Sequence, residues 1–287
     1  MKSANVVRQT WTLMIRELKH WYRVKIQIFM ALIQPIVWLG LFGQAFQLNK
    51  LIPTGDQLPG SLPQFNFSLM FAGAPDYFSY MAAGMLAVIV LFTCMFGGMS
   101  IVWDRRFGFL NKLRASPIPR GVIPVSRIGA TVIRAMIQML IVFVIALLFA
   151  YVPGLTGLTL NPAFNALDFV GLFLAMLLLA IAFASLFTTI ALAVENQETL
   201  FGVINLLNLP IMFASAALFP TTLMPDWLKT VANYNPLTLA VDAARIFIFH
   251  NPNPIYNLWI DLGGLALFAF ALLALSVVLS KKLMGAK

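Results

Sequence analysis

Six long apolar runs, separated by polar or proline-rich stretches, dominate this sequence. A helix needs about 20 mostly apolar residues to cross the roughly 30 Å hydrocarbon layer of a membrane, because it rises about 1.5 Å per residue. Of 287 residues, 61% are apolar and only 10% are charged, against about a quarter charged in an average soluble domain. The pattern predicts an all-α membrane protein with a single domain over residues 1–287. The predicted transmembrane helices are 27–47, 78–102, 128–151, 168–193, 200–219 and 257–280.

The lysines and arginines are distributed unevenly about these runs. Six spans put both termini on one side, and sixteen of the nineteen basic residues fall on that side, before the first span, in the stretch 103–134 and after the last span. Basic residues concentrate in cytoplasmic loops, so both termini are expected in the cytoplasm. The basic residues flank apolar runs and do not form a basic domain, so no nucleic-acid partner is expected.

The sequence lacks the motifs that would place catalysis on this chain. The phosphate-binding loop G-x-x-x-x-G-K-[ST] is absent, so this chain does not hydrolyse ATP by that route. Its two histidines, His20 and His250, are far apart and on opposite predicted faces, and Cys94 is its single cysteine. We therefore expect no catalytic site, no metal site and no cofactor on this chain.

The amino-terminal segment 1–25 has the pattern of an amphipathic helix. Over residues 5–25, apolar side chains recur at helical spacing and basic side chains occupy another face. Such a helix lies in the headgroup layer, with its aromatic rings in the lipid and its cations facing anionic headgroups. It is either a simple lipid anchor or a lever that connects the first span to a cytosolic partner. The residues assigned to this interface helix are Trp11, Arg16, Lys19, Trp21 and Arg23.

The stretch 103–120 combines basic residues with aromatic residues on the predicted cytoplasmic side. Its spacing predicts a short amphipathic helix stopped by prolines. Such a helix can insert into a groove on another protein. The alternative, stop-transfer charges followed by a turn, explains the arginines but leaves Phe107, Gly108 and Phe109 unexplained.

Residues 220–255 are too interrupted by prolines for one span and too apolar for an open loop. Two short helices at, or dipping into, the outer leaflet fit best, because broken backbone survives in a membrane only where protein or water satisfies its polar groups. We expect a local surface salt bridge between Asp242 and Arg245, one helical turn apart. Asp168 and Asp261 fall near the outer ends of spans, where they can reach the headgroups, so no buried carboxylate relay is expected.

Two segments of the chain, 104–120 and 215–245, contain sequence motifs. The second, at 215–245, reads Ser-Ala-Ala-Leu-Phe-Pro, Met-Pro-Asp-Trp-Leu, Asn-Tyr-Asn-Pro-Leu-Thr and Asp-Ala-Ala-Arg. The first consists of Asp104, Arg105, Arg106, Phe107, Gly108, Leu110, Leu113, Arg114, Pro117, Ile118 and Arg120. With the six-span layout, these motifs resemble the type-2 ATP-binding-cassette exporter permeases, which include the daunorubicin-resistance and nodulation-factor permeases. Asp104 stands where family members commonly have Glu, and Ala216 where they have Gly.

The resemblance implies roles for three parts of the chain. The amino-terminal helix would be a connecting helix. A coupling helix at 103–120, with a secondary contact on an acidic turn, would dock on an ATP-binding subunit through Asp104, Arg105, Arg106, Phe107, Gly108, Leu110, Leu113, Arg114, Pro117, Arg120, Glu195 and Glu198. Paired re-entrant helices would form an outer gate with Phe219, Pro220, Trp227, Asn235, Pro236, Asp242 and Arg245.

The implied function is that of the transmembrane permease subunit of an exporter. It would move an amphipathic substrate, such as a drug, a lipid or a lipid-linked saccharide, out of the cytoplasm across the prokaryotic plasma (inner) membrane. The implied partners are a pair of cytosolic ATP-binding subunits that bind ATP and Mg²⁺, a second identical or related permease copy, and membrane lipids. An ion-coupled secondary transporter that needs no ATPase partner is the alternative.

Overall fold

The computed structural model describes residues 2–45, 71–109, 118–194 and 196–283. Within these ranges the regular elements are all helical, as predicted. The two short 3-10 helices are Phe149–Tyr151 and Thr221–Leu223. The α-helices are α1 (Lys2–Arg23), α2 (Lys25–Ala45), α5 (Tyr77–Arg106), α7 (Val122–Leu148), α8 (Ala166–Ala193), α9 (Gln197–Phe213), α10 (Asp226–Asn233), α11 (Pro236–Phe249) and α12 (Leu258–Leu283).

Four helices in the described residues are long and apolar enough to cross a membrane. They are α5, α7 with the 3-10 turn that follows it, α8 and α12, and they coincide with the predicted second, third, fourth and sixth spans. The predicted first span falls on α2, whose apolar part is Leu32–Ala45. The predicted fifth span falls on α9, which has 17 residues and contains Pro210. The structure therefore shows a multi-pass arrangement with four full-length apolar helices.

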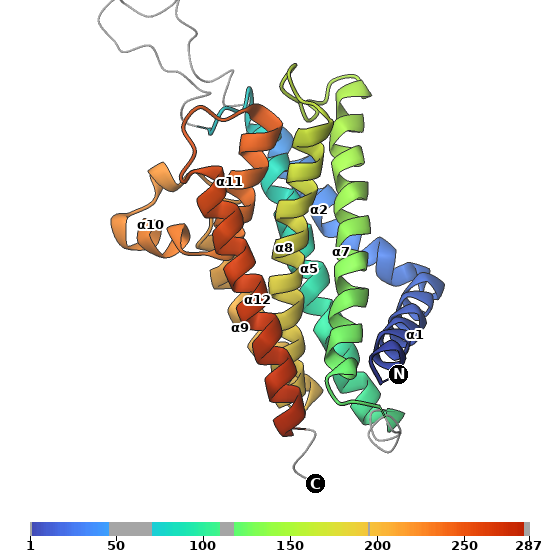
Figure 1. Cartoon of the computed structure of the whole chain (residues 1–287). Helices are drawn as coiled ribbons and strands as arrows, with labels where there is room; N and C mark the ends of the chain where they lie inside the picture. The colour runs from blue at the N-terminus through green and yellow to red at the C-terminus, as the bar shows by residue number, and fades with distance from the viewer. Residues whose placement is uncertain (1, 46–70, 110–117, 195, 284–287) are drawn as a thin grey trace, which may run out of the picture.

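Helix α5 lies at the centre of the bundle (Figure 1), packed against α2, α7, α8 and α11. It is apolar all round, which is typical of a helix enclosed by other helices, and most of its side chains are buried. Glycines allow its neighbours to come close. A Cβ atom added at Gly98 would lie 2.7 Å from the carbonyl oxygen of Phe187 in α8. The backbones of α5 and α8 therefore touch at this level.

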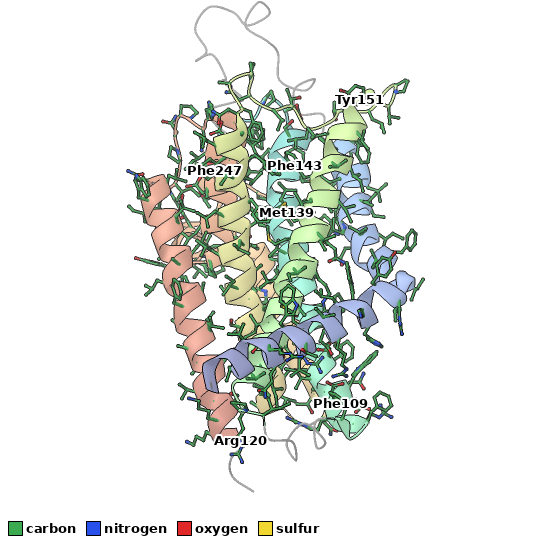
Figure 2. The ribbon with its side chains drawn as sticks, turned by 45° about the vertical axis from the view of Figure 1, so that its right-hand side comes forward. Phe109, Arg120, Met139, Phe143, Tyr151 and Phe247 are labelled. Atoms are coloured by element: carbon green, nitrogen blue, oxygen red, sulfur yellow. The ribbon has the colours of Figure 1, made fainter. Side chains whose placement is uncertain are left out.

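The two ends of the bundle differ in charge. Helix α1 and the carboxyl end of α12 lie at one end (Figure 1), together with Arg105, Arg106 and Arg120, and we call this the basic end. Figure 2 shows α1 lying across the long helices at this end, not along them. At the opposite, far end, α8 begins with a capping box in which Asn165 and Asp168 bind each other's backbone amides. Asp168 thus serves as a cap as well as lying near the end of its helix.

The segment between α9 and α12 contains the two short helices that the sequence predicts, α10 and α11. Asn235 caps α11, since its side-chain oxygen accepts a hydrogen bond from the amide of Leu237 at 2.9 Å. Pro236 occupies the first turn of α11, where its missing amide costs nothing. Helix α11 then packs against α5, α8 and α12, so it belongs to the bundle.

Candidate functional site

At the basic end, Arg127 of α7 forms ion pairs with two carboxylates. One is Glu17 of α1 and the other is Asp104, in the last turn of α5. Arg127 is 4% exposed and Glu17 is 6% exposed. A buried charge is tolerated only when it is paired, so the positions of these three helices depend on one another.

Arg16 joins α1 to the end of α5 a second time. Its guanidinium lies 3.7 Å from a carboxylate oxygen of Asp104 and 3.5 Å from the centroid of the Phe109 ring, which is cation–π geometry. Arg127 also donates a hydrogen bond to the hydroxyl of Ser100 at 3.1 Å. We call Arg16, Glu17, Asp104 and Arg127 the charge cluster.

Helix α5 ends at Arg106, with Phe107 as its carboxyl cap and Gly108 after it, within the stretch predicted as a separate docking helix. Gly108 has φ of 72°, the left-handed conformation that glycine adopts readily after the last turn of a helix. The amide of Phe107 donates to the carbonyl of Trp103 at 2.9 Å. Residues 103–106 are therefore the last turn of α5 and not the beginning of a new helix. Phe107 beyond them is 77% exposed.

Two arginines of this turn hold the junction between α8 and α9. Arg105 donates to the carbonyl oxygens of Val194 at 2.7 Å and Leu192 at 3.0 Å, which otherwise lack partners at the end of a helix. Arg106 donates to the side chain of Gln197 at 3.3 Å. The end of α5 and the α8–α9 junction therefore form one unit.

The remaining residues predicted to couple or to bind lipid are distributed around this unit. Glu198 and Arg120 are exposed. In α1, Trp21 is buried, Trp11 is 56% exposed, and Lys19 and Arg23 are exposed. Five predicted coupling residues lie outside the described residues: Leu110, Leu113, Arg114, Pro117 and Glu195.

Neither Glu17 nor Arg127 was among the site residues predicted from the sequence. A signal for Glu17 was present, because it is the only acid among the first 25 residues. Arg127 was counted only among the basic residues that set orientation, although it follows the apolar residues Val122, Ile123 and Val125 and precedes Ile128.

Toward the far end, side chains bind several backbone groups of the irregular stretch between α9 and α11. Asn235 donates to the carbonyl oxygens of Ile211 and Ala214, both at 2.7 Å. The same side chain caps α11, so it joins the end of α9 to the beginning of α11. Helix α10 is an excursion between these two points. We call residues 214–219 the broken segment.

Two tyrosines of α5 and one arginine of α11 bind the next carbonyl groups of the broken segment. The Tyr80 hydroxyl donates to Ala216 at 3.1 Å, and the Tyr77 hydroxyl donates to Leu218 at 3.4 Å. Arg245 donates to Ala217 at 3.4 Å and to the Tyr80 carbonyl at 3.2 Å. Its guanidinium also lies 3.6 Å from the centroid of the Tyr80 ring.

The predicted surface salt bridge between Asp242 and Arg245 is wrong. Both side chains are buried, at 1% and 2% exposed, and the ion pairs within 4.0 Å in the described residues do not include this pair. Asp242 instead accepts a hydrogen bond from the amide of Tyr256 at 3.0 Å. Both residues face the interior because α11 packs inside the bundle.

The other predicted gate residues lie around the broken segment. Phe219 is about half exposed, Pro220 is buried, and Trp227 in α10 is 70% exposed. An open, apolar groove runs between α9, α10 and α11, with Ile211, Val231 and Tyr234 among its lining residues.

Comparison with known proteins places these features in a family. A model described as ABC-2 type transporter matches residues 8–249. The "Putative transport permease ycf38" of Cyanophora paradoxa is 28% identical over 229 residues, which cover 80% of this chain and 70% of that protein. The "Daunorubicin resistance ABC transporter permease protein DrrB1" of Streptomyces coeruleorubidus is 22% identical over 185 residues, or 62% of each chain.

A third relative is named for a related resistance. The "Probable doxorubicin resistance ABC transporter permease protein DrrC" of Mycobacterium tuberculosis is 26% identical over 188 residues, which cover 63% of this chain and 62% of that protein. The matched family region contains the charge cluster, the broken segment and α11.

Proposed function

Because this chain belongs to the ABC-2 type transporter family, we propose that it is the transmembrane permease subunit of an exporter driven by a separate ATP-binding subunit. A pair of such subunits would bind ATP and Mg²⁺, and this chain would dock on them from the membrane. The substrate class that we propose is amphipathic: a drug, a lipid or a lipid-linked saccharide. The apolar groove beside α10 and the similarity to permeases named for doxorubicin and daunorubicin resistance support this class.

The observation that carries the proposal is the linkage at the basic end. Phe107 and Trp103 are exposed there, at 77% and 43%, and are available to a partner. The same turn of α5 is held to α1 and α7 by the charge cluster and to the α8–α9 junction by Arg105. A partner that displaces Phe107 would therefore also displace α1, α7, α8 and α9 through these charged contacts.

This linkage extends toward the far end through α9. The far end of α9 is joined by Asn235 to α11, and α11 is joined by Arg245 to the broken segment. Movement of the α8–α9 junction would then be transmitted to the proposed outer gate. Physical coupling of this kind needs contiguous contacts between elements with two arrangements, and α9 supplies the connection.

We place the basic end in the cytoplasm, in the plasma (inner) membrane of a prokaryote, because basic residues concentrate on the cytoplasmic side. In this arrangement α2 is the first crossing. Helix α9 and the broken segment make the fifth, and α10 and α11 follow as the re-entrant pair. A second permease copy completes the transport path.

Exchanging exposed aromatic and basic residues at the two ends tests the proposal. The full chain is purified from its native membrane, and the associated Mg²⁺-dependent ATPase activity is measured. Phe107→Ala and Arg106→Glu should reduce the recovered ATPase activity at least tenfold. The matched control Tyr151→Ala, an exposed aromatic residue at the far end, should leave it unchanged.

Two outcomes would contradict the proposal. One is undiminished association with an ATPase in both variants. The other is substrate export by the reconstituted chain alone that needs no ATP and collapses with the proton or sodium gradient, as an ion-coupled secondary transporter would behave.

A further inference from the structure

Asp261, in the first turn of α12, is completely buried and has no hydrogen-bond donor. It is 0% exposed, and neither of its carboxylate oxygens has a partner among the described residues. In both views α12 begins below the far ends of α7 and α8 (Figures 1 and 2), and the burial of Asp261 in its first turn indicates that this carboxyl group lies inside the bundle. The expectation that Asp261 reaches the headgroups is not met. An isolated ionised carboxylate in such a place is strongly unfavourable.

Asp242, at 1% exposed, is a second buried carboxyl group, and its charge acts on Asp261. It lies on α11, which packs against α12, and its own neighbours differ from those of Asp261. It accepts the backbone hydrogen bond of Tyr256, and the charge of Arg245 acts on it. Asp242 therefore has a hydrogen-bond donor, whereas neither carboxylate oxygen of Asp261 has a partner among the described residues.

The other titratable groups on the surrounding elements do not balance the charge of Asp261. From α5 come Tyr77 and Tyr80, which face Arg245, and Tyr256 precedes α12. On α8, Asp168 is engaged with His250 at 3.3 Å. On α7, Arg127 belongs to the charge cluster, and Arg134 donates to Ala130 and Thr131 of its own helix. Among the residues that the structure describes, the buried site therefore contains two carboxyl groups, Asp242 and Asp261, and one cation, Arg245.

We propose that Asp242 and Asp261 form a binding site for a single proton, which resides on Asp261. A proton taken from solvent forms an O–H bond with one Asp261 carboxylate oxygen and makes the buried set of two carboxyl groups and one guanidinium neutral. A metal cation fits less well, because the described residues contain no group of three or more His, Cys, Asp and Glu side chains that could hold one. The site lies outside the charge cluster and does not depend on the proposed function.

Infrared spectroscopy of the full chain in lipid nanodiscs at pH 7 tests this directly. A protonated carboxyl group without a hydrogen-bond partner has a carbonyl stretching band well above the carboxylate bands. The wild-type chain should show this band, and Asp261→Asn should lose it. Asp226→Asn, which changes an exposed carboxylate on α10, should retain it. A spectrum of Asp261→Asn identical to the wild type would overturn the proposal.

Thermal unfolding over a pH series gives a second measurement that does not require Asp261→Asn to be fully active. Raising the pH removes the proton and leaves a buried charge, so the wild-type midpoint should fall as the pH rises. Asn resembles the protonated acid in shape and carries no charge, so the midpoint of Asp261→Asn should fall less. Equal pH slopes, or a wild-type midpoint raised by added NaCl but not by choline chloride, would contradict a proton site.

Discussion

Glu17 of α1 and Arg127 of α7 form an ion pair inside the basic end of the bundle. The contact joins a helix that lies across the bundle to one that runs along it (Figure 2). Asp104 of α5 shares the same guanidinium, so a single side chain fixes the relative positions of three helices. Substitution of Arg127 should therefore destabilise the packing of all three helices at the basic end.

Arg127→Gln should destabilise the protein by about 3 kcal/mol, because it leaves the buried Glu17 and the partly buried Asp104 without their closest cation. The measurement is thermal or denaturant unfolding in detergent. Arg120→Gln, at an exposed position near the start of α7, should stay within about 0.5 kcal/mol of the wild type.

A double-mutant cycle separates this pairing from general damage. Glu17→Gln combined with Arg127→Gln should destabilise the protein less than the sum of the two single changes. The difference should be roughly 1 to 3 kcal/mol, because the double variant removes both charges of the pair and each single variant leaves one of them without its partner. Strict additivity would mean that the ion pair contributes nothing to holding α1.

The Tyr80 hydroxyl is expected to support the broken segment. Tyr80→Phe keeps the ring under the Arg245 guanidinium but removes the donor to the Ala216 carbonyl, and an unsatisfied buried carbonyl costs about 1 to 3 kcal/mol. Unfolding measurements should show a loss in this range. Tyr151→Phe changes a tyrosine that is 84% exposed and should have no effect, and equal effects would count against the assigned role.

Arg105 should stabilise the last turn of α8. Arg105→Met removes two charge-assisted hydrogen bonds to the last carbonyls of α8, each stronger than a neutral one. Amide hydrogen exchange over residues 188–200 should therefore become faster, with little change in α7. Arg106→Met removes one exposed, longer contact and should change exchange far less. If neither variant alters exchange, the α8–α9 junction is stable without these arginines.

The long helices could be predicted because a membrane imposes a length and a composition on each crossing. Runs such as 168–193 satisfy that requirement locally, and α8 occupies nearly the same residues. The end of α5 was harder to predict. Its position depends on the left-handed conformation of Gly108, and a glycine next to aromatic residues fits a docking helix equally well.

The polar contacts inside the bundle could not be predicted, because they depend on which helices meet. Glu17 and Arg127 are distant in sequence, and neither local pattern indicates the other. Asp242 and Arg245 have the spacing of an exposed helical pair, yet both are buried. Their apolar neighbours on every side, from Leu239 and Val241 to Ile246 and Phe247, were the signal that α11 has no solvent-facing side here.

Gly84 of α5 should be essential to the close contact between α5 and the broken segment. A Cβ atom at this position would lie 2.0 Å from the carbonyl oxygen of Ala217, and backbone cannot move aside as a flexible side chain can. Gly84→Ala should therefore displace the carbonyl that Arg245 binds, with a loss of about 1 to 3 kcal/mol in unfolding measurements.

Gly202→Ala provides the control for a glycine inside a helix. Gly202 lies in α9, and a Cβ atom there would meet nothing within 4 Å. Alanine is the better helix former by roughly 0.5 to 1 kcal/mol, so this variant should be slightly stabilised. The opposite sign of the two changes is the distinguishing result. If Gly84→Ala were as stable as Gly202→Ala, the broken segment would not be packed on α5, and the connection from α9 to the proposed outer gate would lose its support.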